Sequence, residues 1–272
     1  MNPIDQVPLF LVVVFAILAQ VFFIEIGFRY GQKNQGPSKK AQMAQVRAIM
    51  GASLGLLAFM LAFSFSIAQQ HFETRTNAYM MEVSAIDSAF RGADLVAADD
   101  RTQAKAVLID FAKLRLELAQ AARTAKPEAL VAMIRESEHM HDLLWSIAER
   151  SMEGPGGGED TGIFAQAVLA MINAHDARLQ AALFNRISPV IWLTLFLMSL
   201  LSMVVMGFQA GLTGTRSRLA TWTLAITFSA VMMLVTDLDR PNMTLFKLNQ
   251  DLMVELENRM LERAPSSPAN LE

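Results

Sequence analysis

The 272-residue sequence contains no cysteine, so disulfide bonds, thiolate metal sites and cysteine nucleophiles are all excluded. This absence does not identify the cellular compartment. Charged residues are also scarce, at 18% of the chain, and four long segments lack them almost completely. Since 53% of the residues are hydrophobic and the mean hydropathy is +0.32, the chain is too apolar for an ordinary soluble domain. These shortages favour an integral membrane protein.

Four apolar segments are each long enough to cross a membrane as a helix, because the hydrocarbon core requires about 20 apolar residues. They cover residues 8–28, 48–68, 188–208 and 219–236, and the only ionisable residue inside them is Glu25. The first segment has no basic region before it and no small-residue cleavage site after it, so we interpret it as a membrane helix and not as a signal peptide. The sequence predicts an all-α integral membrane protein with four transmembrane helices.

The insert between the second and third apolar segments is predicted to be a helical bundle. Its hydrophobic residues recur with helical periodicity, and no alternating strand pattern occurs. The second apolar segment is expected to continue without a break as the first bundle helix, and three further helices follow. Each helix is apolar on one stripe only, so the stripes must be buried against one another. On the second bundle helix the expected stripe comprises Val107, Phe111, Leu114, Leu118 and Ala121.

The sequence therefore divides into five parts. These are a first transmembrane helix with a basic loop (1–47), a second transmembrane helix (48–68), an extramembrane helical bundle (69–186), a third and fourth transmembrane helix (187–238), and a C-terminal helix with a disordered tail (239–272). A glycine-rich stretch inside the bundle lacks the Gly-Lys-Ser/Thr sequence of a phosphate-binding loop. It is interpreted as a linker between helices.

Two loops contain lysine or arginine without any acidic residue, which predicts the orientation of the chain. The loop after the first apolar segment and the loop after the third contain basic residues and no acidic ones, namely Arg29, Lys33, Lys39, Lys40 and Arg47, and then Arg216 and Arg218. By the positive-inside rule both loops are expected in the cytoplasm. The N-terminus, the bundle and the C-terminus are then expected to be extracytoplasmic.

A cluster of acidic residues and histidines in the third bundle helix has the Glu-x-x-His spacing of metal sites in helical bundles. Glu136 has this spacing to His139, and Glu138 has it to His141. On a regular helix the two histidines point in nearly opposite directions, so they cannot bind the same ion. A solvated charged flank is the favoured interpretation, and no metal or cofactor is expected. His175 is the other histidine well placed in the bundle, on the inner stripe of the fourth helix.

No nucleophile has a neighbouring base in a catalytic pattern, so no catalytic residue is assigned and an enzyme is not expected. No nucleic-acid partner is expected either. Small residues have a clearer physical role, since they let membrane helices approach closely. Two pairs have this spacing, Gly51 with Gly55 and Gly207 with Gly211. Packing within one subunit is the favoured interpretation, and packing between subunits is the alternative.

Glu25 is a candidate for ion or proton handling, because acidic residues inside a membrane segment are often functional. Arg29 lies one helical turn further along the chain. A salt bridge between these two residues would neutralise the carboxylate, so both interpretations stay open.

Four stretches contain the most distinctive motifs of the chain. They are GLLAFMLAFSFSIAQQHFETRTNAYMMEVSAIDSAFRGADLV at 55–96, FNRISPVIW at 184–192, MGFQAGLTGTRSR at 206–218 and VTDLDRPNMTLFKLNQDLM at 235–253. In combination they resemble the bacterial family of uncharacterised membrane proteins labelled bestrophin-like, over nearly the whole chain. The resemblance implies an oligomeric anion channel in the bacterial inner membrane. Two departures stand out. Bestrophins keep a large domain in the cytoplasm, whereas the charge pattern here places the insert outside, and no bestrophin pore residue maps onto this sequence.

The densest of these motifs begins just after the second apolar segment, and a second charged motif ends the fourth. Both are expected on the same side of the membrane, where their charged residues would form a functional junction. The candidate residues are Glu73, Arg75, Glu82, Arg91, Asp94, Asp237, Asp239 and Arg240.

Two functions are compatible with the sequence. The first is a bestrophin-like channel for anions or other small ions. The second is a non-transporting membrane scaffold or sensor whose extracytoplasmic bundle binds a partner. The expected partners are the lipid bilayer, further copies of the same chain and, for a channel, small anions.

Overall fold

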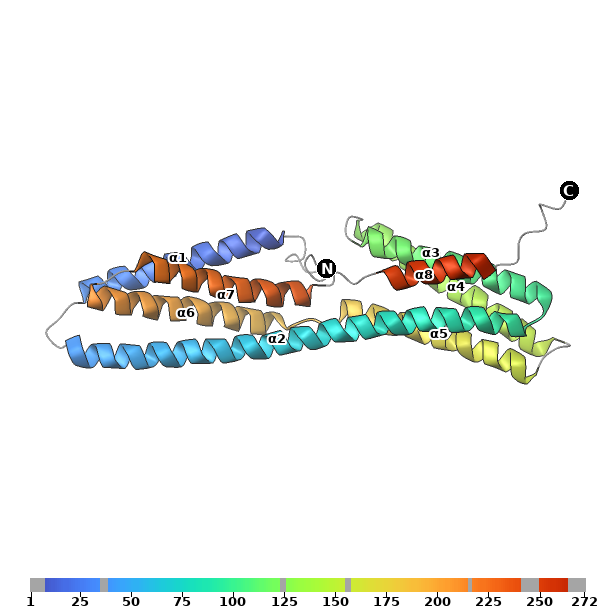
Figure 1. Ribbon diagram of the computed structural model, residues 1–272, viewed down its shortest axis with the longest axis horizontal. Helices are drawn as coiled ribbons and strands as arrows, with labels where there is room; N and C mark the ends of the chain where they lie inside the picture. The colour runs from blue at the N-terminus through green and yellow to red at the C-terminus, as the bar shows by residue number, and fades with distance from the viewer. Residues whose placement is uncertain are drawn as a thin grey trace. The chain divides into compact units, whose positions relative to one another are not determined.

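The computed structural model describes residues 8–34, 39–122, 126–154, 158–214, 217–240 and 250–263. Within these ranges all regular structure is helical (Figure 1): α1 (Leu9–Lys33), α2 (Lys39–Gly92), the 3₁₀ turn η2 (Ala93–Leu95), α3 (Ala98–Ala121), α4 (Pro127–Glu153), α5 (Glu159–Leu183), α6 (Pro189–Thr213), α7 (Arg218–Asp239) and α8 (Asp251–Arg263). Four of them, α1, α2, α6 and α7, are long and apolar enough to cross a membrane. The predicted all-α fold with four transmembrane helices is confirmed.

The chain forms two compact units. The membrane unit contains the described residues within 1–72 and 186–246, and the bundle unit contains those within 73–185 and 247–272. Helix α2 is unbroken from Lys39 to Gly92, so its first part belongs to the membrane unit and its second part to the bundle unit.

In the membrane unit, α1 packs against α6 through glycines on both helices (Figure 1). A methyl group added to Gly27 would overlap the backbone carbonyl oxygen of Val204, and one added to Gly207 would overlap that of Ile24. The same holds one turn further along for Gly31 and Gly211. The two helices therefore touch backbone to backbone, which only glycine permits at these positions.

The other predicted glycine pair lies on α2 and makes no such contact. In the described part of the chain no atom lies within 4 Å of a methyl group built on Gly51 or Gly55. Ala58 and Ala62 continue this exposed row of small residues. The opposite face of α2 is buried instead, through Leu57 and other apolar side chains that pack on α6 and α7.

The bundle unit has one hydrophobic core made by the second part of α2 with η2, α3, α4, α5 and α8. Its largest fully buried side chains include Phe90, Phe111 and Phe164. Helix α8 adds three core residues, Met253, Leu256 and Met260. In addition, the backbone N–H of Met253 donates a hydrogen bond of 3.1 Å to the hydroxyl oxygen of Tyr79.

This packing constrains the membrane topology. Helix α8 follows both later transmembrane helices, yet it shares a core with residues that precede them. The two parts of that core must lie on the same side of the membrane, because a packed core cannot be divided by a bilayer. The segment between α5 and α8 therefore crosses the membrane an even number of times, which agrees with two crossings by α6 and α7.

The buried face of α3 differs from the predicted stripe. Of the five predicted residues only Phe111 is fully buried, while Val107, Leu114, Leu118 and Ala121 are partly exposed. The observed face also contains the cationic residues Lys105 and Arg115, which are 6% and 3% exposed. The predicted stripe contains apolar residues only and therefore omits these two. Each of them can be buried because it forms an ion pair.

Candidate functional site

The core of the bundle unit contains one fully buried carboxylate, Glu82 on α2. Its Oε1 atom lies 2.9 Å from Nε of Arg115 on α3 and 3.2 Å from Nδ1 of His175 on α5. Its Oε2 atom accepts a short hydrogen bond from Nη1 of Arg178, also on α5. A single acidic side chain therefore joins three helices, and it is 0% exposed. We call Glu82, Arg115, His175 and Arg178 the Glu82 cluster.

A second histidine, His141 on α4, extends this cluster. The rings of His141 and His175 meet edge to face with their centroids 4.6 Å apart. The ring of Phe111 lies 5.1 Å from the first and 5.9 Å from the second. The Nε2 atoms of both histidines have no hydrogen-bond partner among the described residues. All four long helices of the bundle thus contribute to this polar centre.

The interpretation of the acidic and histidine-rich stretch of α4 as a solvated flank is wrong for His141, which is only 6% exposed. It holds for the other members of the stretch, since Glu136, Glu138 and His139 are exposed. Among the described residues no group of three or more metal-ligating side chains is placed to hold a metal ion.

The Glu82 cluster lies outside the apolar segment 48–68. Its surroundings determine which of its side chains are charged. Burial favours a raised pKa for Glu82, but the hydrogen bond from His175 and the charges of Arg178 and Arg115 outweigh it and lower this pKa to about 2. Burial, together with the charges of His175 and Arg115, lowers the pKa of His141 to about 4. At neutral pH Glu82 is therefore ionised and His141 is uncharged.

These two pKa values predict that the bundle unit loses stability in acid. Between pH 6.5, the ordinary pKa of histidine, and about 4, the unfolded chain binds a proton at residue 141 that the folded chain does not bind. The free energy of unfolding should therefore fall by up to about 1.4 kcal/mol for each pH unit of acidification. Below the ordinary pKa of 4.5, protonation of Glu82 in the unfolded chain adds a further loss.

Thermal unfolding of the full chain in a non-ionic detergent between pH 8 and pH 4 measures this effect. His141→Gln should reduce the dependence on pH between 6.5 and 4.5, whereas the matched change of the exposed His139, His139→Gln, should keep it. Equal pH profiles for the two variants would contradict the assignment.

The membrane unit has buried acidic residues at the end of α7, and one of them, Asp239, joins this helix to neighbouring segments. Its Oδ1 atom accepts a hydrogen bond of 2.8 Å from the backbone N–H of Ile187 and lies 3.7 Å from Nδ1 of His71. The neighbouring Asp237 and Arg240 are also buried, at 0% and 8% exposed. Asp239 thereby fixes the end of α7 against the segment that leads into α6.

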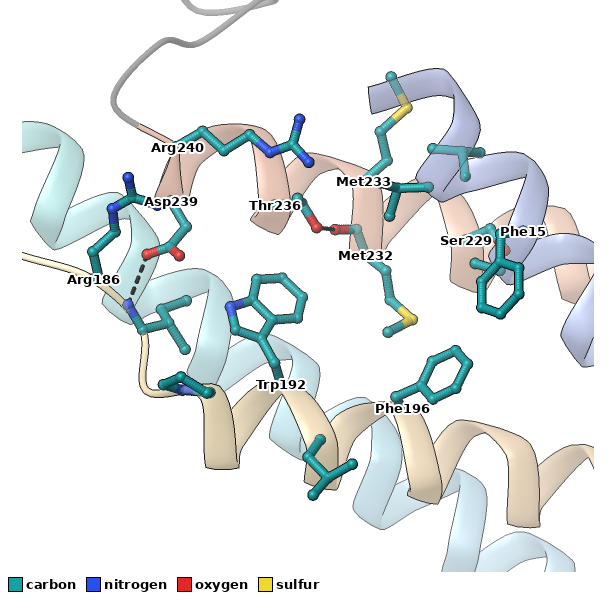
Figure 2. Close-up of a pocket in the computed structure, with 16 residues that line it drawn as sticks. Phe15, Arg186, Trp192, Phe196, Ser229, Met232, Met233, Thr236, Asp239 and Arg240 are labelled. Carbon is teal, nitrogen blue, oxygen red and sulfur yellow. Dashed lines mark hydrogen bonds between the residues drawn. The ribbon is translucent and has the colours of Figure 1, made fainter. Parts of the chain in front are cut away.

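Beside Asp239 the membrane unit contains a cavity of about 470 Å³ between α1, α6 and α7. Figure 2 shows Arg186, Asp239 and Arg240 together at one end of it. Aromatic and methionine side chains line the rest, including Phe15, Trp192, Phe196, Met232 and Met233. The cavity thus has an apolar body and a charged end.

The predicted charged residues after the second apolar segment lie at different places along α2 and η2. Glu73 is exposed, and Arg75 is buried with Nη1 donating a hydrogen bond of 3.5 Å to the backbone oxygen of Asn185. Glu82 lies in the bundle core, nine positions before Arg91 on the same helix. Residues 73 and 91 are 18 positions apart, which corresponds to about 27 Å along the helix.

The last two of these residues make local ion pairs. Arg91 is exposed and pairs with Asp87 at 2.9 Å, while Asp94 pairs with Lys105 at 2.6 Å. In the bundle unit, the contacts thus place Glu82 in the buried cluster and Arg91 and Asp94 in ion pairs, while a functional junction of the predicted residues stays a prediction.

Glu25 forms a salt bridge of 2.8 Å with Arg29, so the structure contains the neutralising contact that the sequence left open. The most important side chains that sequence reasoning missed are Arg115 and Arg178. A usable signal was present for Arg115, which lies four residues after the core residue Phe111 and therefore on the same helical face.

Comparison with known proteins gives one family. Residues 13–242 match the model of the Bestrophin-like domain. The structure of a point variant of a bacterial bestrophin homolog from Klebsiella pneumoniae aligns with 92% of this chain and 98% of its own, at 16% identity and a TM-score of 0.64. A second variant aligns with 92% and 96%, at 16% identity and 0.67. No curated protein matches the chain. The structural likeness establishes the fold.

Proposed function

This chain belongs to the bestrophin-like family, and from that membership we propose that it assembles into an oligomeric channel for small anions in the bacterial inner membrane. The observation that carries the proposal is the family match over residues 13–242, with a fold shared over nearly the whole chain. The resemblance to bestrophins implies the anion selectivity and the oligomer. Several copies are required, because the four apolar helices of one copy offer little polar surface for a pore.

The exposed face of α2 supports the proposal, and we assign to it the contact between copies. It presents a row of small residues, Gly51, Gly55, Ala58 and Ala62, with no atom within 4 Å of the glycines in the described part of the chain. Small residues are the usual contact surface of membrane helices, because they allow close approach where no hydrophobic effect drives association. The glycines of α6, by contrast, are already covered by α1.

Assembly and conduction can be tested with the purified full chain. We expect wild-type protein to form oligomers in a mild detergent and to give unitary, anion-selective currents in planar bilayers. Gly55→Leu should weaken self-association about tenfold, which corresponds to about 1.4 kcal/mol, because the larger side chain prevents close approach of the helices, and it should reduce the currents in parallel. Ala230→Leu is the matched control, because Ala230 is an exposed small residue of α7.

The outcomes separate the two parts of the proposal. Electrically silent wild-type oligomers would contradict the channel. Oligomers and currents that are unchanged by Gly55→Leu would contradict the assigned contact. The orientation is tested separately by inserting, between α4 and α5, a reporter that is active only outside the cytoplasm, and we expect it to be active.

A non-transporting scaffold or sensor is the second candidate, because the bundle unit exposes large apolar side chains. Met81 and Val131 are 63% and 54% exposed, and Ile163 and Leu169 are 48% and 47% exposed. Such residues are common in surfaces that bind other proteins. This function predicts silent oligomers and a partner that co-purifies with wild-type protein but not with Met81→Glu. Both candidates are non-enzymatic.

A further inference from the structure

The cavity of the membrane unit has the size and lining of a ligand site. Its volume of about 470 Å³ falls within the range of about 300–1,000 Å³ that is typical of small-molecule sites. Phe15 of α1, Trp192 and Phe196 of α6 and two methionines of α7 surround its body (Figure 2). Since α1, α6 and α7 are apolar enough to cross a membrane, the adjoining medium is lipid and the natural occupant of this body is an acyl chain.

The charged end of the cavity suits an anion. Two of the charged side chains that line it are cationic, Arg186 and Arg240, and one is anionic, Asp239. The carboxylate of Asp239 already accepts a hydrogen bond from the backbone N–H of Ile187. Pro189, the first residue of the 25-residue helix α6, lines the same cavity, so the positive end of a helix dipole adds to the arginine charges.

We propose that this cavity binds one anionic phospholipid, with an acyl chain in the apolar body and the phosphate at Arg186 and Arg240. Both arginines adjoin the ends of apolar membrane segments, which is the depth at which lipid headgroups lie. A free anion would leave the apolar body empty. A zwitterionic lipid would fill the body but would bring no net negative charge to Arg186 and Arg240. The proposal does not depend on the channel function.

Trp192 lies in the cavity and provides an intrinsic reporter. The chain has three tryptophans, so Trp145→Phe with Trp222→Phe leaves Trp192 as the only one. The variant that retains only Trp192 is titrated, in a non-ionic detergent, with phosphatidylglycerol that has brominated acyl chains. Bromine quenches the fluorescence of nearby indole rings. Brominated phosphatidylcholine is the comparison. A second protein that retains only Trp222, which is 44% exposed and does not line the cavity, reports on general contact with lipid.

We expect brominated phosphatidylglycerol to quench Trp192 saturably and at a mole fraction well below that required by brominated phosphatidylcholine. Trp222 should show no such preference. Arg240→Gln and Arg186→Gln should each weaken the quenching of Trp192 by phosphatidylglycerol about fivefold, since a basic residue near anionic lipid contributes about that factor. Arg29→Gln is the matched control, because Arg29 is a membrane-unit arginine that does not line the cavity.

Filling the cavity gives an independent test. Ala16 lines the cavity and Ala230 does not, so Ala16→Leu should weaken the quenching of Trp192 by both lipids, whereas Ala230→Leu should change neither. Thermal unfolding of every variant confirms that it is folded.

Three results would overturn the proposal. The first is equal quenching of Trp192 by the two lipids. The second is the same lipid preference at Trp222 as at Trp192. The third is a combination of two observations: millimolar inorganic phosphate releases the brominated phosphatidylglycerol, and Ala16→Leu has no effect on the quenching. Together they would indicate a site for a free anion.

Discussion

Replacement of Glu82 by alanine is expected to destabilise the bundle unit by about 3–5 kcal/mol, the usual effect of removing one partner from a buried ion pair. Arg115 is 3% exposed, so without Glu82 its positive charge would remain buried with no carboxylate beside it. His175 would lose its hydrogen-bond partner in the same core. The bundle unit should unfold at a markedly lower temperature in detergent, and the yield of folded protein should fall.

The control is Glu138→Ala on α4, which removes an exposed carboxylate and should change stability by no more than about 0.5 kcal/mol. The double variant Glu82→Gln with Arg115→Leu should recover part of the loss, because it removes the buried charge of Arg115 and leaves only that of Arg178, whose side chain is 16% exposed. Equal unfolding temperatures for Glu82→Ala and Glu138→Ala would show that the cluster does not stabilise the bundle.

Alanine at Gly207 should destabilise the membrane unit, whereas alanine at Gly51 should stabilise it slightly. The methyl group at position 207 would overlap the backbone carbonyl oxygen of Ile24 on α1. Relief of this overlap must separate two closely packed helices, and overpacking of this kind costs about 1–3 kcal/mol or more. In a detergent that dissociates the copies, the methyl group at position 51 meets no described atom, so the higher helix propensity of alanine, up to about 1 kcal/mol, is gained.

The opposite signs make the comparison informative. Unfolding temperatures of the two variants in the same detergent should shift in opposite directions, with the larger shift for Gly207→Ala. A change of the same sign and size in both would contradict backbone contact between α1 and α6.

The membrane helices could be predicted from the sequence because each depends on one local property. A bilayer requires about 20 apolar residues in a row, and this requirement can be read without knowledge of any other part of the chain. For the contact between α1 and α6, the sequence indicates only the glycines of α6. Gly207 and Gly211 were recognised by their spacing, but Gly27 and Gly31 at the end of α1 were not.

The Glu82 cluster could not be predicted in the same way, because its members come from helices far apart in the sequence. Arg115 lies 33 residues after Glu82, and Arg178 lies 96 residues after it. Hydrophobic periodicity treats such residues as marks of an exposed face, so it predicts a stripe on α3 that omits Arg115 and a solvated position for His141. Charges that compensate one another across a core produce no local pattern from which their burial can be inferred.

The docking of α8 makes completion of the bundle depend on a helix that is synthesised after α6 and α7. Met253, Leu256 and Met260 leave the ribosome after both later membrane helices, so the surface that they cover is open until those helices have been made. Domains fold during synthesis from the N-terminus onward, which leaves an incomplete core exposed in any chain that stops early. A chain that stops before α8 therefore exposes this apolar surface, and only a chain in which both later membrane helices have been made can cover it.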